Sequence, residues 1–128
     1  MSKKKKVVVI KRHMWATPKN IEKWNDDHPD NPFASSVLVD GSSGQRCCLG
    51  FIAVACGVPL AQCKDRGNPS DLDYRPAIAP LASEVGRNSD LSEKAILIND
   101  NADISDKKRE QRLLKLFADS PYELKFVD

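Results

Sequence analysis

The feature that most constrains this chain is a long apolar stretch near its middle, residues 45–58 (QRCCLGFIAVACGV). Past Arg46 it contains no charged residue, and its apolar side chains fall on every side of a helical projection rather than along one stripe. A helix that is apolar all round is normally buried in the middle of a domain. At about 14 residues the stretch is shorter than the about 20 that a membrane-spanning helix needs. We therefore expect one buried helix over residues 45–56, with the rest of the chain packed around it.

The residues on either side of this stretch predict where the helix begins and ends. Ser42 and Gln45 have the S-x-x-Q spacing of a capping box, which places the first turn of the helix just after them. Gly57 is suited to the left-handed conformation that ends many helices. Pro59 cannot continue a helix, so the helix is expected to end before it.

The remaining patterns predict a small α+β fold. With 128 residues, 30% of them charged and 41% hydrophobic, the chain has the size and composition of one globular domain, so we assign residues 1–128 to a single domain. Runs of β-branched or alternating residues predict a short antiparallel sheet with strands near residues 5–12, 37–39 and 122–127. Periodicity predicts three or four helices around the central one, at residues 19–25, 81–85, 91–98 and 106–118. The predicted N-caps are Thr17 for the first of these helices, Asp90 for the third and Ser105 for the fourth.

The overall charge and the N-terminal residues limit the classes of function. The formal net charge is +2, which is too small to indicate a nucleic-acid-binding protein by itself. Only four apolar residues separate Lys6 from Lys11, too few for the apolar region of a signal peptide. We therefore expect a cytoplasmic protein whose four cysteines are thiols.

Two short motifs lie about 50 residues apart: Cys47–Gly50 (CCLG), which opens the central helix, and Leu97–Asp100 (LIND), which precedes an amphipathic helix. In these features residues 46–118 resemble a loose group of small phage-encoded proteins, which carry a Cys-Cys-Leu-Gly helix and later a Leu-Asn-Asp turn before a helix. Members usually have Phe and a small residue after that turn, where this chain has Ala102–Ile104 and a strongly basic helix. The resemblance implies a phage or prophage origin, and it implies no catalytic activity.

The four cysteines allow two interpretations. Cys48 and Cys56 are eight residues apart, about 12 Å along a helix, which is too far for a shared zinc ion or for a disulfide. The first interpretation is that all four are small core residues, with no metal and no other cofactor. The alternative is a thiol-dependent hydrolase in which Cys48 is the nucleophile and His13 takes its proton. Papain-like and cell-wall-peptidase-like enzymes place the histidine after the cysteine, whereas both histidines precede it here.

Two basic segments are candidates for a contact with phosphate groups. Lys11 and Arg12 end the first predicted strand, and Lys108, Arg112 and Lys115 lie on one face of the last helix. If the strand and the helix are neighbours, these five residues form one patch that can contact nucleic acid. The alternative is a solvated face without a ligand, since no aromatic residues are interleaved for base stacking.

The turn before the central helix is a second candidate site, in this case for a small anion or a nucleotide. Ser42, Ser43 and Arg46 would surround backbone N–H groups at a helix N-terminus, a position that favours negative charge. The turn lacks the Lys-Ser/Thr ending of a phosphate-binding P-loop. A capped turn without a ligand is therefore the alternative.

These observations favour a binding protein over an enzyme. Our leading hypothesis is a small phage or prophage accessory protein that binds a host or defence component in the host cell cytoplasm, without catalysis of its own and without a membrane partner. Two alternatives stay open. One is a nucleic-acid- or nucleotide-binding protein that uses the basic patch, and the other is the thiol-dependent hydrolase.

Overall fold

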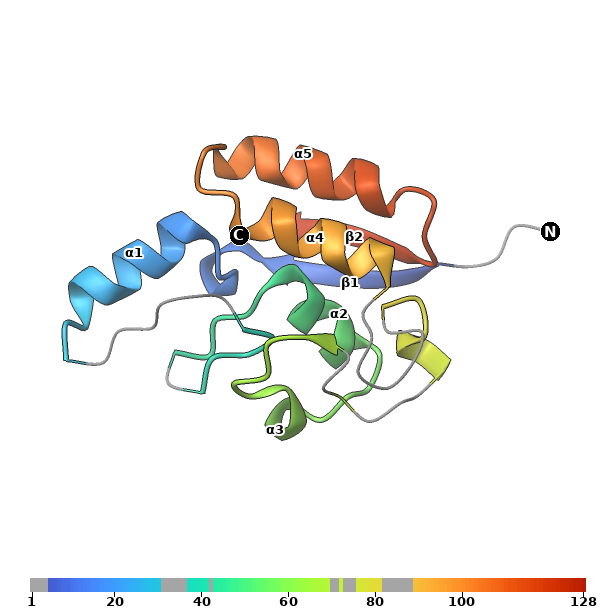
Figure 1. Ribbon diagram of the computed structural model, residues 1–128, viewed down its shortest axis with the longest axis horizontal. Coiled ribbons are helices and arrows are strands. Elements are labelled where there is room, and N and C mark those ends of the chain that lie inside the picture. Colours follow the sequence, from blue (N-terminus) through green and yellow to red (C-terminus); the bar gives the residue numbers. More distant parts are fainter. Residues whose placement is uncertain (1–4, 31–36, 42, 70–71, 73–75, 82–88) are drawn as a thin grey trace.

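The computed structural model describes residues 5–30, 37–41, 43–69, 72, 76–81 and 89–128. Helices form most of the regular secondary structure in the described residues, and a small sheet joins the two ends of the chain (Figure 1). The elements in chain order are β1 (Lys6–Lys11), the 3₁₀ helix η1 (Arg12–Met14), α1 (Pro18–Asp27), α2 (Cys48–Ala55), α3 (Leu60–Cys63), the 3₁₀ helix η3 (Pro76–Ile78), α4 (Asp90–Asp100), α5 (Asp106–Phe117) and β2 (Tyr122–Val127). The result is a helix-rich α+β fold.

The sheet is parallel, so the antiparallel sheet predicted from the sequence is wrong. β1 pairs with β2 in one continuous register, from Lys6 opposite Tyr122 onward. Residues 37–39, predicted as a third strand, do not join this sheet, and Val39 instead forms an isolated bridge with Lys64. Alternating apolar residues indicate that a segment is a strand, but they carry no information about its direction or its partner.

The direction of β2 follows from the way α5 runs along the sheet. Arg12, just after β1, bonds to Glu110 in the first half of α5. Lys6, at the start of β1, donates its N–H to the carbonyl of Pro121, which follows α5. α5 therefore runs against β1. The turn after α5, held by the Ser120 hydroxyl, brings the chain back in the direction of β1. Nearly the whole chain serves as the long crossover that a parallel pair needs.

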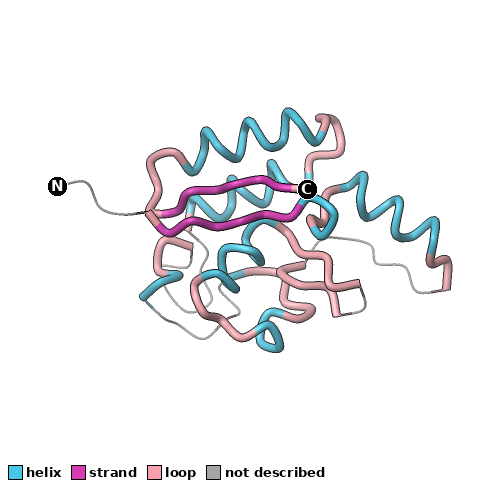
Figure 2. The backbone as a smooth tube through the Cα atoms, turned by 180° about the vertical axis from the view of Figure 1, so that it is seen from behind, coloured by secondary structure: helices cyan, strands magenta, loops and turns pink. Residues whose placement is uncertain are grey.

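The sheet is buried on one face and open on the other. Val8 and Ile10 point inward and are fully buried, whereas Val7 and Val9 are 48% and 46% exposed. α2 packs against β1, and α5 packs against β2. Figure 2 shows the outer face of the two strands with no described helix in front of it. Residues 7–10 of β1 are thus all apolar, and their side chains face the surface and the core in alternation.

Helix α2 is buried over most of its length, as its apolar pattern predicted. Six of its residues, Cys48–Ala53, are buried, and they form the middle of the core. Its end is also as predicted, because Gly57 adopts a φ of +93°, the left-handed conformation that favours glycine. The next residue, Val58, donates its N–H back to the carbonyl of Ala53. This bond satisfies one of the carbonyls that the end of a helix leaves unpaired.

The start of α2 differs from the prediction, because the helix begins at Cys48 rather than at residue 45. Arg46 is extended instead, and it forms an isolated parallel bridge with Trp15. The N-cap residue is Cys47, whose side chain makes no capping bond. Ser42, the proposed cap, lies outside the described residues. A backbone bridge to a distant segment therefore overrides the local capping signal.

Three other helices begin at a hydroxyl N-cap. In each, the side chain accepts a hydrogen bond from a backbone N–H three residues on, in the pairs Thr17–Asn20, Ser89–Ser92 and Ser105–Lys108. The first and third caps were predicted and are confirmed, whereas the cap predicted for α4 was Asp90, which is the first helical residue. α4 also extends through Asp100, past its predicted end at residue 98. Apart from Leu81, the helical turn predicted at 81–85 lies outside the described residues.

The described helices are short compared with a bilayer. The longest, α5, has 12 residues and carries charged side chains along one face. A transmembrane helix needs about 20 mostly apolar residues. Within the described ranges, no helix has the length and apolar character needed to cross a membrane.

Gly50 is the position in α2 with the least room for a side chain. A Cβ atom there would lie 1.8 Å from the carbonyl oxygen of Leu38, so one of the two backbones would have to move. We expect Gly50→Ala to lower the free energy of unfolding by more than about 3 kcal/mol, measured by urea denaturation. Gly67→Ala is the control, because a Cβ there meets no atom within 4 Å. Equal effects of the two substitutions would contradict the packing of α2 against residues 37–39.

Candidate functional site

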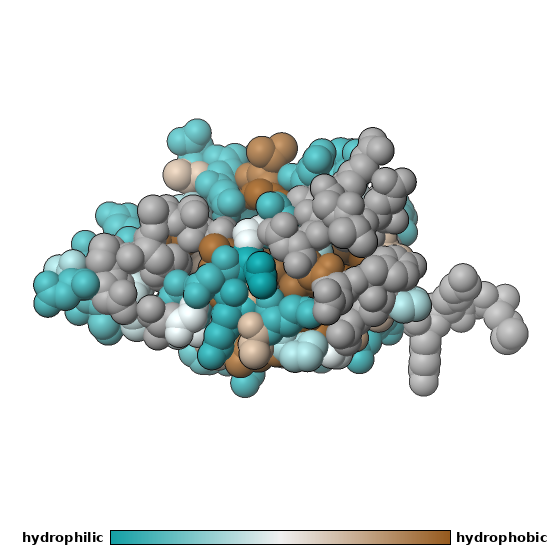
Figure 3. Space-filling model, turned by 60° about the horizontal axis from the view of Figure 1, so that its bottom comes forward, coloured by the Kyte–Doolittle hydropathy of each residue, from teal (hydrophilic) through white to brown (hydrophobic). Residues whose placement is uncertain are grey.

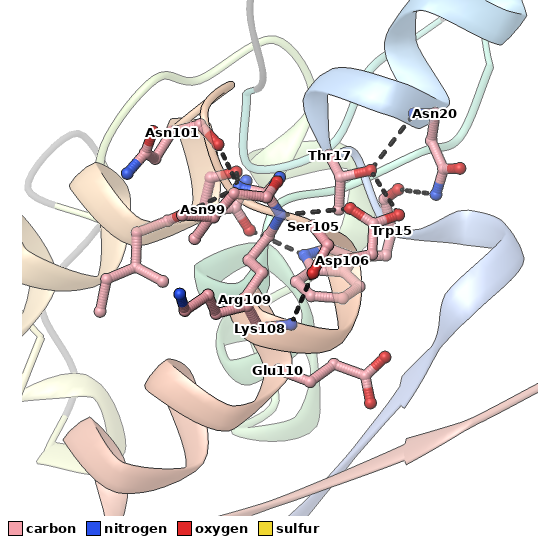
Figure 4. Close-up of polar contacts among 12 residues, drawn as sticks. Trp15, Thr17, Asn20, Asn99, Asn101, Ser105, Asp106, Lys108, Arg109 and Glu110 are labelled. Atoms are coloured by element: carbon pink, nitrogen blue, oxygen red, sulfur yellow. Dashed lines mark hydrogen bonds and ion pairs between the residues drawn. The ribbon is translucent and has the colours of Figure 1, made fainter.

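The start of α2 is held by the side chain of Asn99, which is 1% exposed. Figure 4 shows Asn99 among neighbouring polar residues, including Arg109. Its Oδ1 accepts hydrogen bonds from the Cys48 N–H at 3.1 Å and from Trp15 Nε1 at 2.7 Å. Its Nδ2 donates to the carbonyl of Ala16 at 3.0 Å and to Asp100 Oδ1 at 3.1 Å. A side-chain amide has two N–H donors and one oxygen with two lone pairs. Every bond that Asn99 can make is therefore used within the protein.

A second buried polar side chain, Arg109 of α5, binds the end of α4. Its guanidinium, also 1% exposed, donates to four carbonyl oxygens at 2.8–3.0 Å, those of Ile98, Asn99, Asn101 and Ile104. Its Nε donates to Asp106 Oδ1 at 3.3 Å. A cation suits the negative end of a helix dipole. The sequence signal for this role is the position of Arg109 four residues before Leu113, on the buried face of α5.

The two cysteines at the start of α2 are buried thiols. Burial raises the pKa of the Cys47 thiol to about 12 and that of Cys48 well above its ordinary value. At a pKa of about 12, about one thiol in 10⁵ is ionised at pH 7. The thiolate is the nucleophilic form, so these thiols are poorly suited to attack a substrate. His13 is exposed in η1, and no hydrogen bond between described residues joins it to Cys48.

The space beside these thiols is very small. It measures about 20 Å³ and is enclosed by the start of α2, the end of α4 and Gly67. A hollow of this size holds about one water molecule, so it has no room for a substrate. In the part of the chain that the structure describes, no group of three or more His, Cys, Asp or Glu side chains is placed to hold a metal ion.

The turn proposed as an anion site is folded around carboxylates of the protein itself. Asp40 Oδ2 accepts hydrogen bonds from both the backbone N–H and the hydroxyl of Ser43, at 2.7 and 2.8 Å. Asp65 Oδ1 accepts from the N–H of Gly41 at 3.0 Å. Carboxylates of the protein thus already accept the hydrogen bonds of the Gly41 and Ser43 donors that an anion at this turn would need. Because α2 begins at Cys48, the turn also lies away from the N-terminus of that helix.

The basic residues predicted as one patch fall in separate places. Lys108, Arg112 and Lys115 are exposed on the outer face of α5. Arg12 lies beside α5, but Glu110 binds it through two hydrogen bonds of 2.9 Å, and Asp128 binds it through a third. Its charge is therefore paired, and the patch is interrupted there.

A groove runs along β1 on the side away from β2, between the strand and α2; we call it the β1–α2 groove. Its first part, a hollow of about 380 Å³, is lined by Lys6, Val7, Val9, Lys11, Met14, Arg46, Phe51, Val54 and Ala55. A second part, of about 410 Å³, shares Lys6 and Ala55 with the first and turns past the start of the two strands, where Tyr122 of β2, Cys56, Pro76 and Pro80 line it. The lining is mostly apolar with cations at its edges. Lys11 and Arg46, predicted at two different sites, meet here.

Arg46 is the most enclosed cation of the groove. Its guanidinium lies over the ring of Phe51, 5.2 Å from the ring centroid, and burial lowers its pKa. The ion pairs between described residues involve Arg12 and Arg109, and none involves Arg46. A partly desolvated cation without a carboxylate partner favours a negatively charged ligand.

The outer face of β1 also differs from the rest of the described surface. On the side of the molecule in Figure 3, hydrophilic residues cover most of the described surface and hydrophobic ones reach it in small groups. The large hydrophobic side chains that are exposed among the described residues are Val7, Val9, Leu60, Leu97 and Leu114. Three of these stand singly on α3, α4 and α5. Val7 and Val9 are neighbours on one face of one strand, beside the groove.

Comparison of the chain with protein-family models, with curated proteins and with solved structures finds no match. Roles for individual residues therefore come from the geometry of this chain. That geometry separates a structural cluster around Asn99 and Arg109 from an accessible groove beside β1.

Thiol labelling separates buried cysteines from a nucleophile. Cys47, Cys48 and Cys63 are buried, whereas Cys56 is partly exposed at the edge of the groove. We expect a neutral alkylating reagent to modify Cys56 first. The rate should increase as the pH rises, because the thiolate is the reactive form and burial raises the pKa of this thiol. The other three should react only after unfolding, as followed by mass spectrometry. Rapid single-site labelling of Cys47 or Cys48 below pH 7 would instead support the hydrolase.

Removal of the Asn99 amide should be costly because it leaves several buried groups without partners. We expect Asn99→Ala to lower the free energy of unfolding by about 2–4 kcal/mol. Asn101→Ala is the matched control, since the Asn101 side chain accepts one exposed hydrogen bond, from the N–H of Asp103. That variant should lose less than about 1 kcal/mol in the same denaturation experiment. A loss at Asn99 no larger than at Asn101 would refute the capping role.

Proposed function

We propose that this protein acts by binding another protein through the outer face and open edge of β1, and that it has no catalytic site of its own. The observation that carries the proposal is the pair of exposed valines, Val7 and Val9, at the rim of a groove lined by apolar residues. An apolar surface rimmed by polar residues is typical of an interaction site. The groove also holds cations that no described carboxylate neutralises.

The buried state of the cysteines supports binding rather than catalysis. Cys48 is fully buried beside a hollow that holds about one water, and the Asn99 oxygen near it is already bonded twice. A nucleophile needs an ionised, accessible thiol and a base within reach. The start of α2 supplies a tightly bonded structural cluster instead.

The target on this proposal is a host or defence component, and the protein acts in the host cell cytoplasm as a phage or prophage accessory protein. Support for this part comes from the two motifs, Cys47–Gly50 and Leu97–Asp100, that resemble small phage proteins. Both motifs lie in the structural cluster, where Asn99 binds the Cys48 N–H. The resemblance therefore concerns the scaffold, and the groove would carry the contact that is particular to this chain.

A second candidate function is binding of nucleic acid by the outer face of α5. The exposed cations Lys108, Arg112 and Lys115 support it, because they are spaced to follow one side of the helix. Contacts of this kind go to phosphates and depend strongly on salt. The groove and the α5 face lie on different elements, so substitutions can test them separately.

A matched pair of substitutions tests the main proposal. Val9→Glu and Leu97→Glu each place a carboxylate at an exposed hydrophobic position, one beside the groove and one on α4, where Leu97 is 72% exposed. We expect a host protein that co-purifies with the wild type and with Leu97→Glu to be lost with Val9→Glu, measured by quantitative mass spectrometry. Unfolding curves of both variants should stay within about 1 kcal/mol of the wild type. A partner that both variants retain equally would contradict the proposal.

Charge reversal on α5 tests the second candidate. The triple variant Lys108→Glu, Arg112→Glu and Lys115→Glu changes only exposed side chains, so we expect the free energy of unfolding to change by less than about 1 kcal/mol. If α5 binds nucleic acid, wild-type affinity for a DNA or RNA duplex falls steeply with salt and the triple variant abolishes it. Because we favour the groove as the binding site, we expect no such binding by the wild type. Salt-dependent binding that the triple variant loses would instead favour the nucleic-acid function.

A further inference from the structure

We propose that the β1–α2 groove receives an extended, acidic segment of the partner protein, which pairs with the open edge of β1 as a third strand. The inference rests on the proposed function and names the chemistry of the partner. It requires three properties of the groove: free backbone groups along one edge, an apolar wall, and a positive potential.

The register of the sheet places the free backbone groups. The Lys6 N–H is bonded to Pro121, and the pairs continue without a bulge to Lys11 opposite Val127. Backbone groups alternate in direction along a strand. Those of Lys6, Val8 and Ile10 therefore point to β2, and those of Val7, Val9 and Lys11 point away from it, toward the groove. The described sheet has only two strands, so no strand among the described residues pairs with this edge.

The walls of the groove suit an extended segment rather than a compact ligand. One wall is β1, with the apolar side chains of Val7 and Val9 two residues apart, about 7 Å along the strand. The facing wall is α2, with Phe51, Val54 and Ala55. A strand that adds to a sheet edge gains main-chain hydrogen bonds, and its alternate side chains enter the space beside the edge. A groove between a strand edge and a helix offers both.

The charges of the groove select an acidic occupant. Lys6 and Lys11 stand at the two ends of β1, and Arg46 lies between β1 and α2, with no carboxylate among the described lining residues. The same charges disfavour a second copy of this chain. Pairing two β1 strands antiparallel would bring the lysines at the start of one strand, Lys5 and Lys6, close to Lys11 of the other, and like charges on paired strands repel.

Lysines on an edge strand also have a purely protective role in other proteins, since they prevent strand edges from aggregating. If the lysines only protect the edge, the groove has no need to prefer a ligand of a particular sequence. Strand pairing requires a ligand that is both acidic and able to form main-chain hydrogen bonds on one side. Peptide binding therefore separates the two roles.

The probe is a fluorescein-labelled synthetic peptide, Asp-Glu-Val-Thr-Val-Thr-Val-Glu-Asp, titrated with the full chain and followed by fluorescence anisotropy. We expect saturable binding that weakens at least tenfold when lysines replace the four acidic residues. Two further peptides carry N-methyl groups on either the valine or the threonine amides. Neighbouring amides point to opposite sides of a strand, so one methylated peptide should lose at least tenfold in affinity and the other less than threefold.

A pair of protein variants ties the binding to the groove. Lys11→Glu should weaken the acidic peptide at least tenfold, whereas Lys108→Glu, which makes the same change of net charge on α5, should leave its affinity within threefold. Both lysines are exposed, so both variants should fold. Equal losses in the two variants would show attraction to overall charge and would overturn the inference.

The remaining outcomes decide between the inference and the function on which it rests. Absence of binding, equal binding of the acidic and lysine peptides, or equal effects of the two methylated sets would each overturn strand pairing. If a partner is nevertheless lost with Val9→Glu, the proposed function stands without it. A dimer that Lys11→Glu strengthens in analytical ultracentrifugation would assign the edge to a second copy and overturn the acidic segment.

Discussion

The structure depends on two buried polar side chains that satisfy helix ends. Asn99 closes the start of α2 and also binds Trp15 and Ala16, while Arg109 closes the end of α4 from α5. Backbone groups at helix ends have no partner within the helix, and each one buried without a bond costs about 1–3 kcal/mol. By supplying those bonds, the two side chains join α2, α4, α5 and the segment after β1. The domain therefore needs no large sheet to fix the arrangement of its helices.

A sheet this small leaves edges that larger sheets would cover. Within the described part of the chain, β1 is buried on one face, paired on one edge and open on the other edge and face, so its apolar residues Val7 and Val9 remain at the surface. α2, fixed in place by Asn99, forms the opposite wall of the groove beside that edge. The stability of the fold and the proposed binding thus depend on different residues of the same elements. Substitutions in the β1–α2 groove can therefore change binding without disrupting the structural cluster around Asn99 and Arg109.

Local signals in the sequence were sufficient for several elements and insufficient for their arrangement. The buried helix near 45–56 and the N-caps Thr17 and Ser105 follow from neighbouring residues, and the structure confirms them. The parallel direction of β2 depends on how α5 lies along β1, a contact between residues about 100 positions apart that no periodicity records. The start of α2 was missed for the same reason, because it is fixed by distant residues: Arg46 forms a bridge with Trp15, and Asn99 of α4 binds the Cys48 N–H. The groove was missed because its walls are two separate segments, and only Lys11 and Arg46 had been singled out, for other sites.

Hydrogen exchange of backbone amides in the free protein, measured by NMR, tests the central claim most directly. The claim is that β1 is paired with β2 on one edge and free on the other. We expect the amides of Val8 and Ile10, which point to β2, to exchange slowly, and those of Val7 and Val9, which point to the groove, to exchange quickly. Slow exchange at Val7 and Val9, comparable to that at Val8, would contradict the account, because it would mean that the edge is already covered.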